Sequence, residues 1–247
     1  MRLKGRDKYK MHLAMNNNLL LQPHLPDTKK WTKKNFYQML KDYQAVVVKP
    51  NNGKQGKNIY FIEKGQSNYT LSINKETKEF KRRYQVYTYL TEAIGDKEFI
   101  IQREINLAKI DNRRFDFRII VQRLSLKSPW EVTGILARKG GSGYKVTNRR
   151  HHGTALALEE ALNKLDIPEH LKERLVNNLK ELSLLAAETL GQSYPKQTIF
   201  GVDIGMDQKG NLYIFELNLW PLLGGFRSLE DRTQIKRIMA YKKAVEN

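Results

Sequence analysis

The chain has 247 residues, and its 44 Lys and Arg against 26 Asp and Glu give a net charge of +18 at pH 7. Hydrophobic residues make up 40% of it, which is enough for a packed core and too many for a disordered chain. The sequence contains no cysteine, which excludes disulfides, iron–sulfur clusters and cysteine-ligated zinc.

The sequence has neither an apolar run long enough to span a membrane nor a secretory signal, so a cytoplasmic protein is expected. Its positive charge favours an anionic partner, such as nucleotide phosphates or an acidic peptide. The basic residues are spread along the chain without an RNA-recognition, zinc-finger or leucine-zipper signature, so nucleic acid is not the expected partner. A basic surface that merely faces solvent is the alternative interpretation.

Helical patterns open the chain. Residues 7–20 carry apolar side chains at helical spacing, and PHLPDT at 23–28 interrupts them because proline disfavours helix. A second helix is predicted over 32–43, beginning at a capping threonine. Strands and one further helix follow, as β-rich runs separated by turn residues: strands at 45–50, 59–64, 69–74, 78–83, 98–105, 115–125 and 130–140, and a helix at 83–94.

The last third of the chain alternates loop, helix and hairpin. Residues 140–154 (GGSGYKVTNRRHHGT) are predicted to form a flexible polar loop, whose two histidines are ordinary loop residues rather than metal ligands. The strongest helix is predicted over 168–192, beginning at a proline and ending near Gly191. A last helix is predicted at about 228–245.

Residues 198–221 (TIFGVDIGMDQKGNLYIFELNLWP) predict an antiparallel hairpin with unusual polar residues. Glu216 and Asn218 are two apart and so share one face, and Asp203 can lie across from them. Two carboxylates and an amide oxygen form the kind of oxygen-rich site that Mg²⁺ prefers. The alternative is that these side chains are simply the exposed face of a half-buried hairpin.

The stretch AVVVKPNNGKQGKN at 45–58 places Lys49 at the end of a buried strand, before a basic loop that contains glycines. Glycines allow backbone N–H groups to approach phosphate oxygens, and lysines supply positive charge. The P-loop pattern is absent, and an ordinary turn is an equally good interpretation of this stretch alone.

The order of the motifs is more specific than any one of them. The chain contains DKYKMHLAMN, LQPHLPDT, VVVKPNNGKQGKNI, FDFRIIVQR and KVTN in that order, followed by GVDI and E-x-N-x-x-P at 216–221. In this order it resembles the ATP-grasp superfamily, and within it the branch of endospore coat-associated YheC/YheD-like proteins. The resemblance covers about residues 6–228. It implies an α+β fold in which two lobes clamp a nucleotide between antiparallel sheets, here divided as 1–104 and 105–247.

The resemblance also implies roles for individual residues. Metal binding falls to Asp203, Glu216 and Asn218, which match the Mg²⁺-binding set of the family. The expected nucleotide contacts come from phosphate-binding lysines, a lid loop, a hinge and a ribose-binding acid: Lys8, Lys49, Gly53, Lys54, Gly56, Gln102, Arg103, Glu104, Ile105 and Asp111. Arg118, Arg138 and Asn148 lie where the family places groups around the transferred phosphate, although either arginine can instead belong to the solvent face of a strand.

The implied reaction is an ATP- and Mg²⁺-dependent ligation of a carboxylate to an amine, through an acylphosphate and with release of ADP. The substrate would be an amino acid or peptide, and the basic charge suits an acidic one. Only about six residues precede the first motif, whereas such ligases usually carry another domain there. Three explanations remain open: a minimal ligase, a partner protein that supplies the domain, or a nucleotide-binding, spore-coat-associated protein that has lost ligase activity.

Overall fold

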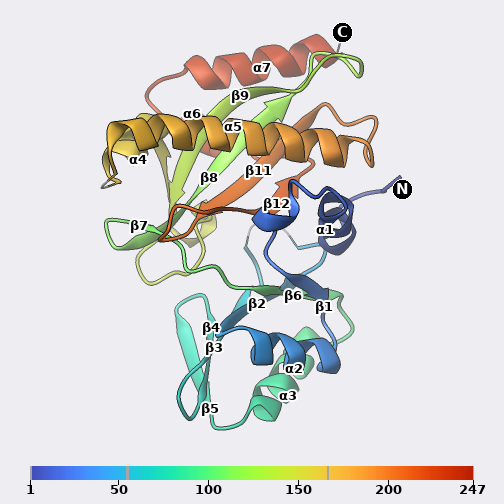
Figure 1. Cartoon of the computed structure of the whole chain (residues 1–247), viewed down its shortest axis with the longest axis vertical. Helices are drawn as coiled ribbons and strands as arrows, with labels where there is room; N and C mark the ends of the chain where they lie inside the picture. Colours follow the sequence, from blue (N-terminus) through green and yellow to red (C-terminus); the bar gives the residue numbers. More distant parts are fainter. Residues whose placement is uncertain (1, 54–55, 166, 247) are drawn as a thin grey trace.

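The computed structural model describes residues 2–53, 56–165 and 167–246, which form two lobes, each built on an antiparallel sheet (Figure 1). The strand order is β1-β6-β2-β3-β4-β5 in the first sheet and β10-β9-β8-β11-β12 in the second, where β7 also pairs with β8. The predicted fold class, α+β with two antiparallel sheets, is confirmed. The strands are β1 (Thr28–Lys30), β2 (Ala45–Pro50), β3 (Tyr60–Lys64), β4 (Tyr69–Ile73), β5 (Glu76–Phe80), β6 (Phe99–Arg103), β7 (Lys109–Ile110), β8 (Arg113–Gln122), β9 (Glu131–Lys139), β10 (Thr154–Ala157), β11 (Ile199–Met206) and β12 (Leu212–Asn218).

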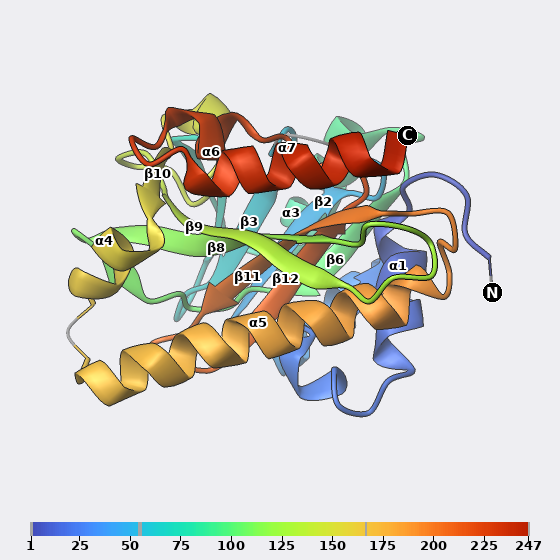
Figure 2. The same ribbon diagram turned by 90° about the horizontal axis from the view of Figure 1, so that it is seen from above.

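Helices cover one face of the first sheet (Figure 1) and both faces of the second (Figure 2). The α2 helix begins as predicted, because the Thr32 hydroxyl accepts a hydrogen bond from the Asn35 N–H. The helices are α1 (Lys8–Asn16), α2 (Lys33–Asp42), α3 (Arg83–Ile94), α4 (Leu158–Asn163), α5 (Glu169–Gly191), α6 (Gly224–Ser228) and α7 (Thr233–Glu246), with 3₁₀ turns at Gln22–His24 and Arg149–His151. None of the described helices combines the length and apolar composition that crossing a bilayer requires.

The two faces of the second sheet follow from the alternation of side chains along β8. Phe115 and Phe117 lie in the core that α5 covers, whereas Asp116, Arg118 and Ile120 point to the opposite face. On that face Ile120 packs against the apolar side chains of α6 and α7. Asp116 and Arg118 lie outside this apolar cluster and form polar contacts instead. The sheet therefore presents a polar area beside an apolar one on the same face.

The first helix packs with the second lobe although it is far from it in sequence. Met11 and Met15 are buried in the same core as α5, and Leu21 follows them into it. The predicted division into 1–104 and 105–247 thus places in the first part a helix whose apolar side chains are covered by the second. Burial of its apolar face thus holds α1 against the second lobe.

The strand predicted at 78–83 lies instead at Glu76–Phe80, and two further predicted segments differ from the structure. The loop at 140–154 is not uniformly irregular, because it contains a 3₁₀ turn with a buried His151 and leads into β10 at Thr154. The helix predicted at about 228–245 begins later, as α7 at Thr233, whose N–H donates to the Asp231 carboxylate, and the short helix α6 that precedes it was not predicted.

Candidate functional site

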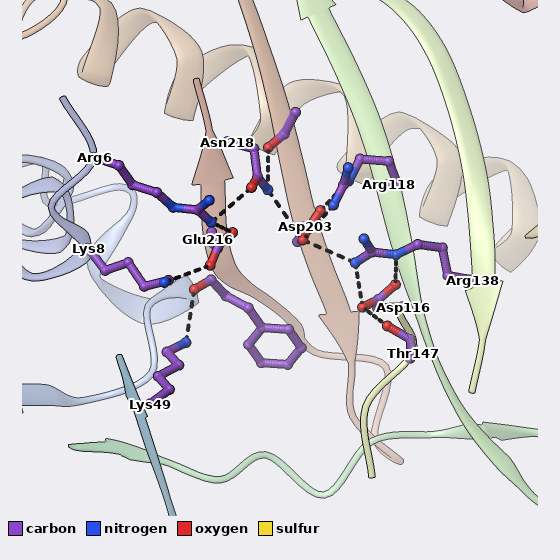
Figure 3. Close-up of polar contacts among 12 residues, drawn as sticks. Arg6, Lys8, Lys49, Asp116, Arg118, Arg138, Thr147, Asp203, Glu216 and Asn218 are labelled. Atoms are coloured by element: carbon purple, nitrogen blue, oxygen red, sulfur yellow. Dashed lines mark hydrogen bonds and ion pairs between the residues drawn. The ribbon is translucent and has the colours of Figure 1, made fainter. Parts of the chain in front are cut away.

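The β11–β12 hairpin brings the three predicted metal ligands to one face. Asp203 pairs directly with Glu216, and Gly201 pairs with Asn218, so the three polar side chains are neighbours across the ladder. A register shift after Asp203 leaves Phe215 as an extra residue in β12. Such bulges re-aim side chains and are frequent beside functional sites. The hairpin therefore places two carboxylates and an amide together, as predicted (Figure 3).

Asp203 belongs to a buried ionic cluster on strands β8, β9 and β11. The guanidinium group of Arg118 donates two hydrogen bonds to its carboxylate, and Nη2 of Arg138 lies 3.1 Å from Oδ2. Burial raises the pKa of the Asp203 carboxyl, but Arg118 and Arg138 outweigh burial and hold the pKa below its usual value. The Asp203 side chain is therefore an anion at neutral pH.

Arg138 links Asp203 to a second buried carboxylate. Its Nε and Nη2 atoms each donate to Asp116 at 2.7 Å, and the Thr147 hydroxyl donates to the same carboxylate at 2.7 Å. Burial lowers the pKa of Arg138, but the charges of Asp116 and Asp203 outweigh it and raise the pKa. Arg138 is thus a permanent cation held between two anions.

Glu216 lies at the other end of this polar face, among cations. Nη2 of Arg6 donates to Glu216 Oε1 and also to Asn218 Oδ1, at 3.0 Å in the second case. Nζ of Lys8 lies 3.7 Å from Glu216 Oε2. The Asn218 amide donates weakly to Asp203 Oδ2 at 3.4 Å, which connects the two ends of the face.

The two predicted phosphate-binding lysines approach β12 from α1 and β2: Lys8 lies beside Glu216, and Nζ of Lys49 lies 3.5 Å from the carbonyl oxygen of the neighbouring Phe215. Nζ of Lys8 donates to the carbonyl groups of Pro50 and Gly53 at 3.0 and 2.7 Å, so it holds the start of the glycine loop. Burial lowers the pKa of Lys8 to about 8, although the charge of Glu216 opposes this. Burial also lowers the pKa of Lys49, whose Nζ donates to Gln102 Oε1 at 2.8 Å.

The predicted hinge residues lie at the end of β6 and point in different directions. The buried Gln102 side chain donates to the Thr28 hydroxyl and accepts from Lys49, so Thr28 fixes the amide that holds the lysine. The guanidinium of Arg103 lies instead over the Tyr43 ring. Ile105 is buried in the core.

Two carboxylates lie in this hinge or after it. Glu104 is nearly buried, and its Oε1 forms an ion pair with Nη1 of Arg114 at 2.6 Å. Its Oε2 has no hydrogen-bond partner in the described part of the chain. Asp111, the predicted ribose ligand, lies on the turn between β7 and β8, where Lys139 holds it at 2.6 Å. Of the two, Glu104 is the buried carboxylate with an available oxygen.

The lid loop lies against the segment that carries Asn148. Gly56 has a φ of +71°, a backbone conformation that favours glycine, and the Asn148 amide lies where a Cβ atom would be. The ring of His151 lies next to the same position. Gly53 contacts Lys8 through its carbonyl group, and Lys54 lies outside the described residues.

A small cavity of about 20 Å³ lies between the lobes, and it is lined by both sides of the site, including Lys8, Gln102, Phe215 and Glu216. Small-molecule sites generally have volumes of about 300–1,000 Å³, so a nucleotide could enter here only if side chains or lobes move apart. A larger, open cavity of about 720 Å³ lies in the first lobe between α2 and the β3–β4 turn, and none of the predicted site residues lines it.

The donor set on the hairpin fits a hard divalent cation. Asp203 and Glu216 supply carboxylate oxygens, and the third donor is the amide oxygen of Asn218. No group of three or more His, Asp or Glu side chains suited to a metal occurs in the described ranges, so the amide is needed to complete the set. Arg6 already occupies Glu216 and Asn218, and its contact must change if a cation binds between them.

Sequence reasoning assigned no role to three residues that the structure brings to this face: Arg6, Asp116 and Thr147. Asp116 could have been found, because it is two residues from Arg118 and therefore shares its face. Arg6 carried no such signal, because it lies before the first helix and outside any periodic pattern.

Comparisons with known proteins agree with this fold. The family model for YheC/D-like ATP-grasp domains matches residues 3–244. Endospore coat-associated protein YheD of Bacillus subtilis (strain 168) is 25% identical over 223 residues, covering 87% of this chain and 48% of YheD. The chain thus spans about half the length of this curated relative.

Solved structures with the same fold include enzymes. N5-carboxyaminoimidazole synthetase from Staphylococcus aureus, complexed with ADP, has a TM-score of 0.61 at 10% identity, covering 97% of this chain and 52% of that one. D-alanine–D-alanine ligase from Bacillus anthracis has a TM-score of 0.54 at 16% identity, covering 96% and 63%. At such identities the likeness establishes the fold alone.

Proposed function

The chain belongs to the YheC/D-like ATP-grasp family, and from this membership and the geometry of the site we propose that it is an ATP- and Mg²⁺-dependent carboxylate–amine ligase. The proposed reaction joins an amino acid or peptide carboxylate to an amine through an acylphosphate, with release of ADP. One observation carries the proposal. Two lysines suited to phosphate, Lys8 and Lys49, reach the hairpin that holds the oxygen donors for a metal, at Glu216 and at the carbonyl group of the neighbouring Phe215.

Each part of the site has a role in this proposal. Mg²⁺, when bound, would neutralise phosphate charge and orient the phosphates. Asp203, Glu216 and Asn218 would hold it, and the two lysines would bind phosphate oxygens. Positioning and electrostatic stabilisation supply most of the catalysis in phosphoryl transfer, so the reaction requires no nucleophilic side chain of the protein.

Arg118 and Arg138 are proposed to stabilise the negative charge of the transferred phosphate. Both use Nε and Nη2 to hold Asp203 or Asp116, and in the described part of the chain no hydrogen bond engages their Nη1 groups. The carboxylates thus fix the orientation of each guanidinium while N–H groups stay free for an anion. Asn148, beside the lid glycine, would add a polar contact there.

For the ribose hydroxyls the geometry favours Glu104 as a second candidate beside Asp111. Glu104 directly follows the strand that carries Gln102 and has an available buried oxygen, whereas Lys139 holds Asp111. The hinge residues 102–105 would contact the adenine through backbone groups.

The proposal is tested by product analysis. The purified protein is incubated with ATP, Mg²⁺ and a panel of amino acids and acidic peptides, and nucleotide products are separated by chromatography. We expect ADP to form only when both a carboxylate and an amine are present. Formation of AMP would contradict the acylphosphate route.

The second candidate function is nucleotide binding without ligation, which the coat-associated relative YheD favours. In that case the protein would be a structural component of a spore coat, with or without a partner protein. ATP-dependent thermal stabilisation together with no turnover across the whole panel would support this alternative.

Nucleotide binding should depend on pH through Lys8. Its pKa of about 8 means that the amine is charged at pH 7 and mostly neutral at pH 9. If the charged form binds phosphate, ADP affinity should fall about tenfold between these values. Isothermal titration calorimetry at both pH values measures the affinity for ADP. The Lys8→Met variant should bind weakly at both, and an equal pH dependence in that variant would exclude Lys8 as the cause.

A further inference from the structure

Arg6 lies against two of the three proposed metal ligands of the hairpin. A single nitrogen, Nη2, donates to both Glu216 and Asn218, so one positive group bridges two of the three proposed ligands (Figure 3). The Arg6 side chain is 12% exposed and that of Glu216 19%, so solvent screens their interaction only in part. Arg6 thus neutralises Glu216 in the way that a cation would.

The backbone around Arg6 is held in place on both sides. Gly5, with a φ of +64°, accepts a hydrogen bond from the Tyr194 hydroxyl at 2.8 Å, and Leu3 donates to Ser193 at 2.9 Å. On the other side Asp7 caps α1. Departure of Arg6 from Glu216 therefore requires rotation of its side chain rather than movement of this segment.

The guanidinium of Arg6 has unused capacity for an anion. Its Nε is buried and has no hydrogen-bond partner within the described residues. An unpaired buried donor is costly, and a phosphate oxygen would satisfy it. A nucleotide can therefore offer Arg6 a new partner at the same time as it delivers a metal to Glu216 and Asn218.

We propose that Arg6 makes the site selective for the metal–nucleotide pair over the free metal, an inference that rests on the proposed metal role of Asp203, Glu216 and Asn218. Without nucleotide, the bridging guanidinium blocks two ligands and repels a divalent cation. With nucleotide, the phosphates draw the guanidinium away and the ligands become available. Arg6 is thus a specificity-determining residue, and the small volume of the adjoining cavity fits a site that is closed until both ligands arrive.

The test is direct metal binding, with Mn²⁺ as the probe and free Mn²⁺ measured by electron paramagnetic resonance, with and without ADP. The wild type should bind Mn²⁺ weakly alone and much more tightly with ADP. Arg6→Gln should bind Mn²⁺ alone at least about tenfold more tightly than the wild type, because the repelling charge is gone. Arg6→Lys, which keeps the charge, should stay close to the wild type.

The control is Arg2→Gln, which removes the same charge from an exposed position of the same segment and should leave Mn²⁺ affinity unchanged. Equal affinity of wild type and Arg6→Gln for Mn²⁺ alone, with ADP strengthening both equally, would overturn the role of Arg6 while keeping the metal site. Absence of Mn²⁺ binding in every protein, with or without ADP, would instead overturn the proposed metal function. Melting curves check that Arg6→Gln is folded. If it is not, the wild type and Arg6→Lys decide the question: tight binding of Mn²⁺ without ADP by these two proteins would overturn the proposal.

Discussion

Replacement of Glu216 by Gln is expected to reduce Mg²⁺-dependent ADP formation by at least about 10²-fold while the protein stays folded. The variant keeps the shape of the side chain and removes one anionic ligand from the hairpin. It also leaves Lys8 and Arg6 without their shared carboxylate, so we expect a modest loss of stability as well. A loss of 1 kcal/mol would lower the melting temperature by about 2–4 °C in a chain of this size.

Two measurements on this variant separate the metal role from a general defect. Thermal shift with ADP should show a stabilisation that requires Mg²⁺ in the wild type and is lost in Glu216→Gln. Glu92→Gln makes the same chemical change at an exposed position of α3 and should behave as the wild type. Wild-type turnover in Glu216→Gln would show that the metal assignment is wrong.

Local patterns predicted the β11–β12 hairpin because its determinants are local. Turn residues at 207–211 fix the connection, and a spacing of two puts Glu216 and Asn218 on one face. The direct pairing of Asp203 with Glu216 does not follow from that turn alone, because it also requires the extra residue, Phe215, in β12. For the same reason the capped start of α2 at Thr32 was predictable from a few residues.

Contacts between distant segments were beyond such patterns. Asp203 is held by Arg118 and Arg138, which lie 85 and 65 residues before it in the sequence. Sequence alone did not show that β8 adjoins β11 or that β9, beyond β8, shares its polar face. Arg6 reaches Glu216 only because Tyr194 and its neighbours hold the preceding backbone. The family resemblance pointed to Arg118 and Arg138, but it indicated neither their contacts with Asp203 nor the contact of Arg6 with Glu216.

Replacement of Arg138 by Met should destabilise the fold more than any surface change. It leaves Asp116, only 6% exposed, with the Thr147 hydroxyl but without its guanidinium partner. Breaking a buried ion pair in this way typically costs about 3–5 kcal/mol, because one charge stays buried and uncompensated. Chemical denaturation of the wild type and the variant measures the difference in the free energy of unfolding.

The pH dependence of that loss identifies its cause. Burial already raises the pKa of Asp116, and removal of Arg138 would raise it further above the unfolded value. The folded variant would then bind more protons than the unfolded chain, so its deficit relative to the wild type should shrink as the pH falls from 7 to 5.

The double variant Arg138→Met/Asp116→Asn completes this comparison, because it removes the uncompensated charge together with its partner. We expect it to recover part of the lost stability and to lose the pH dependence. If single and double variants were equally unstable at every pH, lost packing rather than an unpaired carboxylate would explain the effect.

Because Arg138 holds Asp116 and Asp203 together, loss of activity alone could not show that it contacts phosphate. A variant that is refolded at low pH yet remains inactive there, under conditions in which the wild type is active, would support the catalytic role.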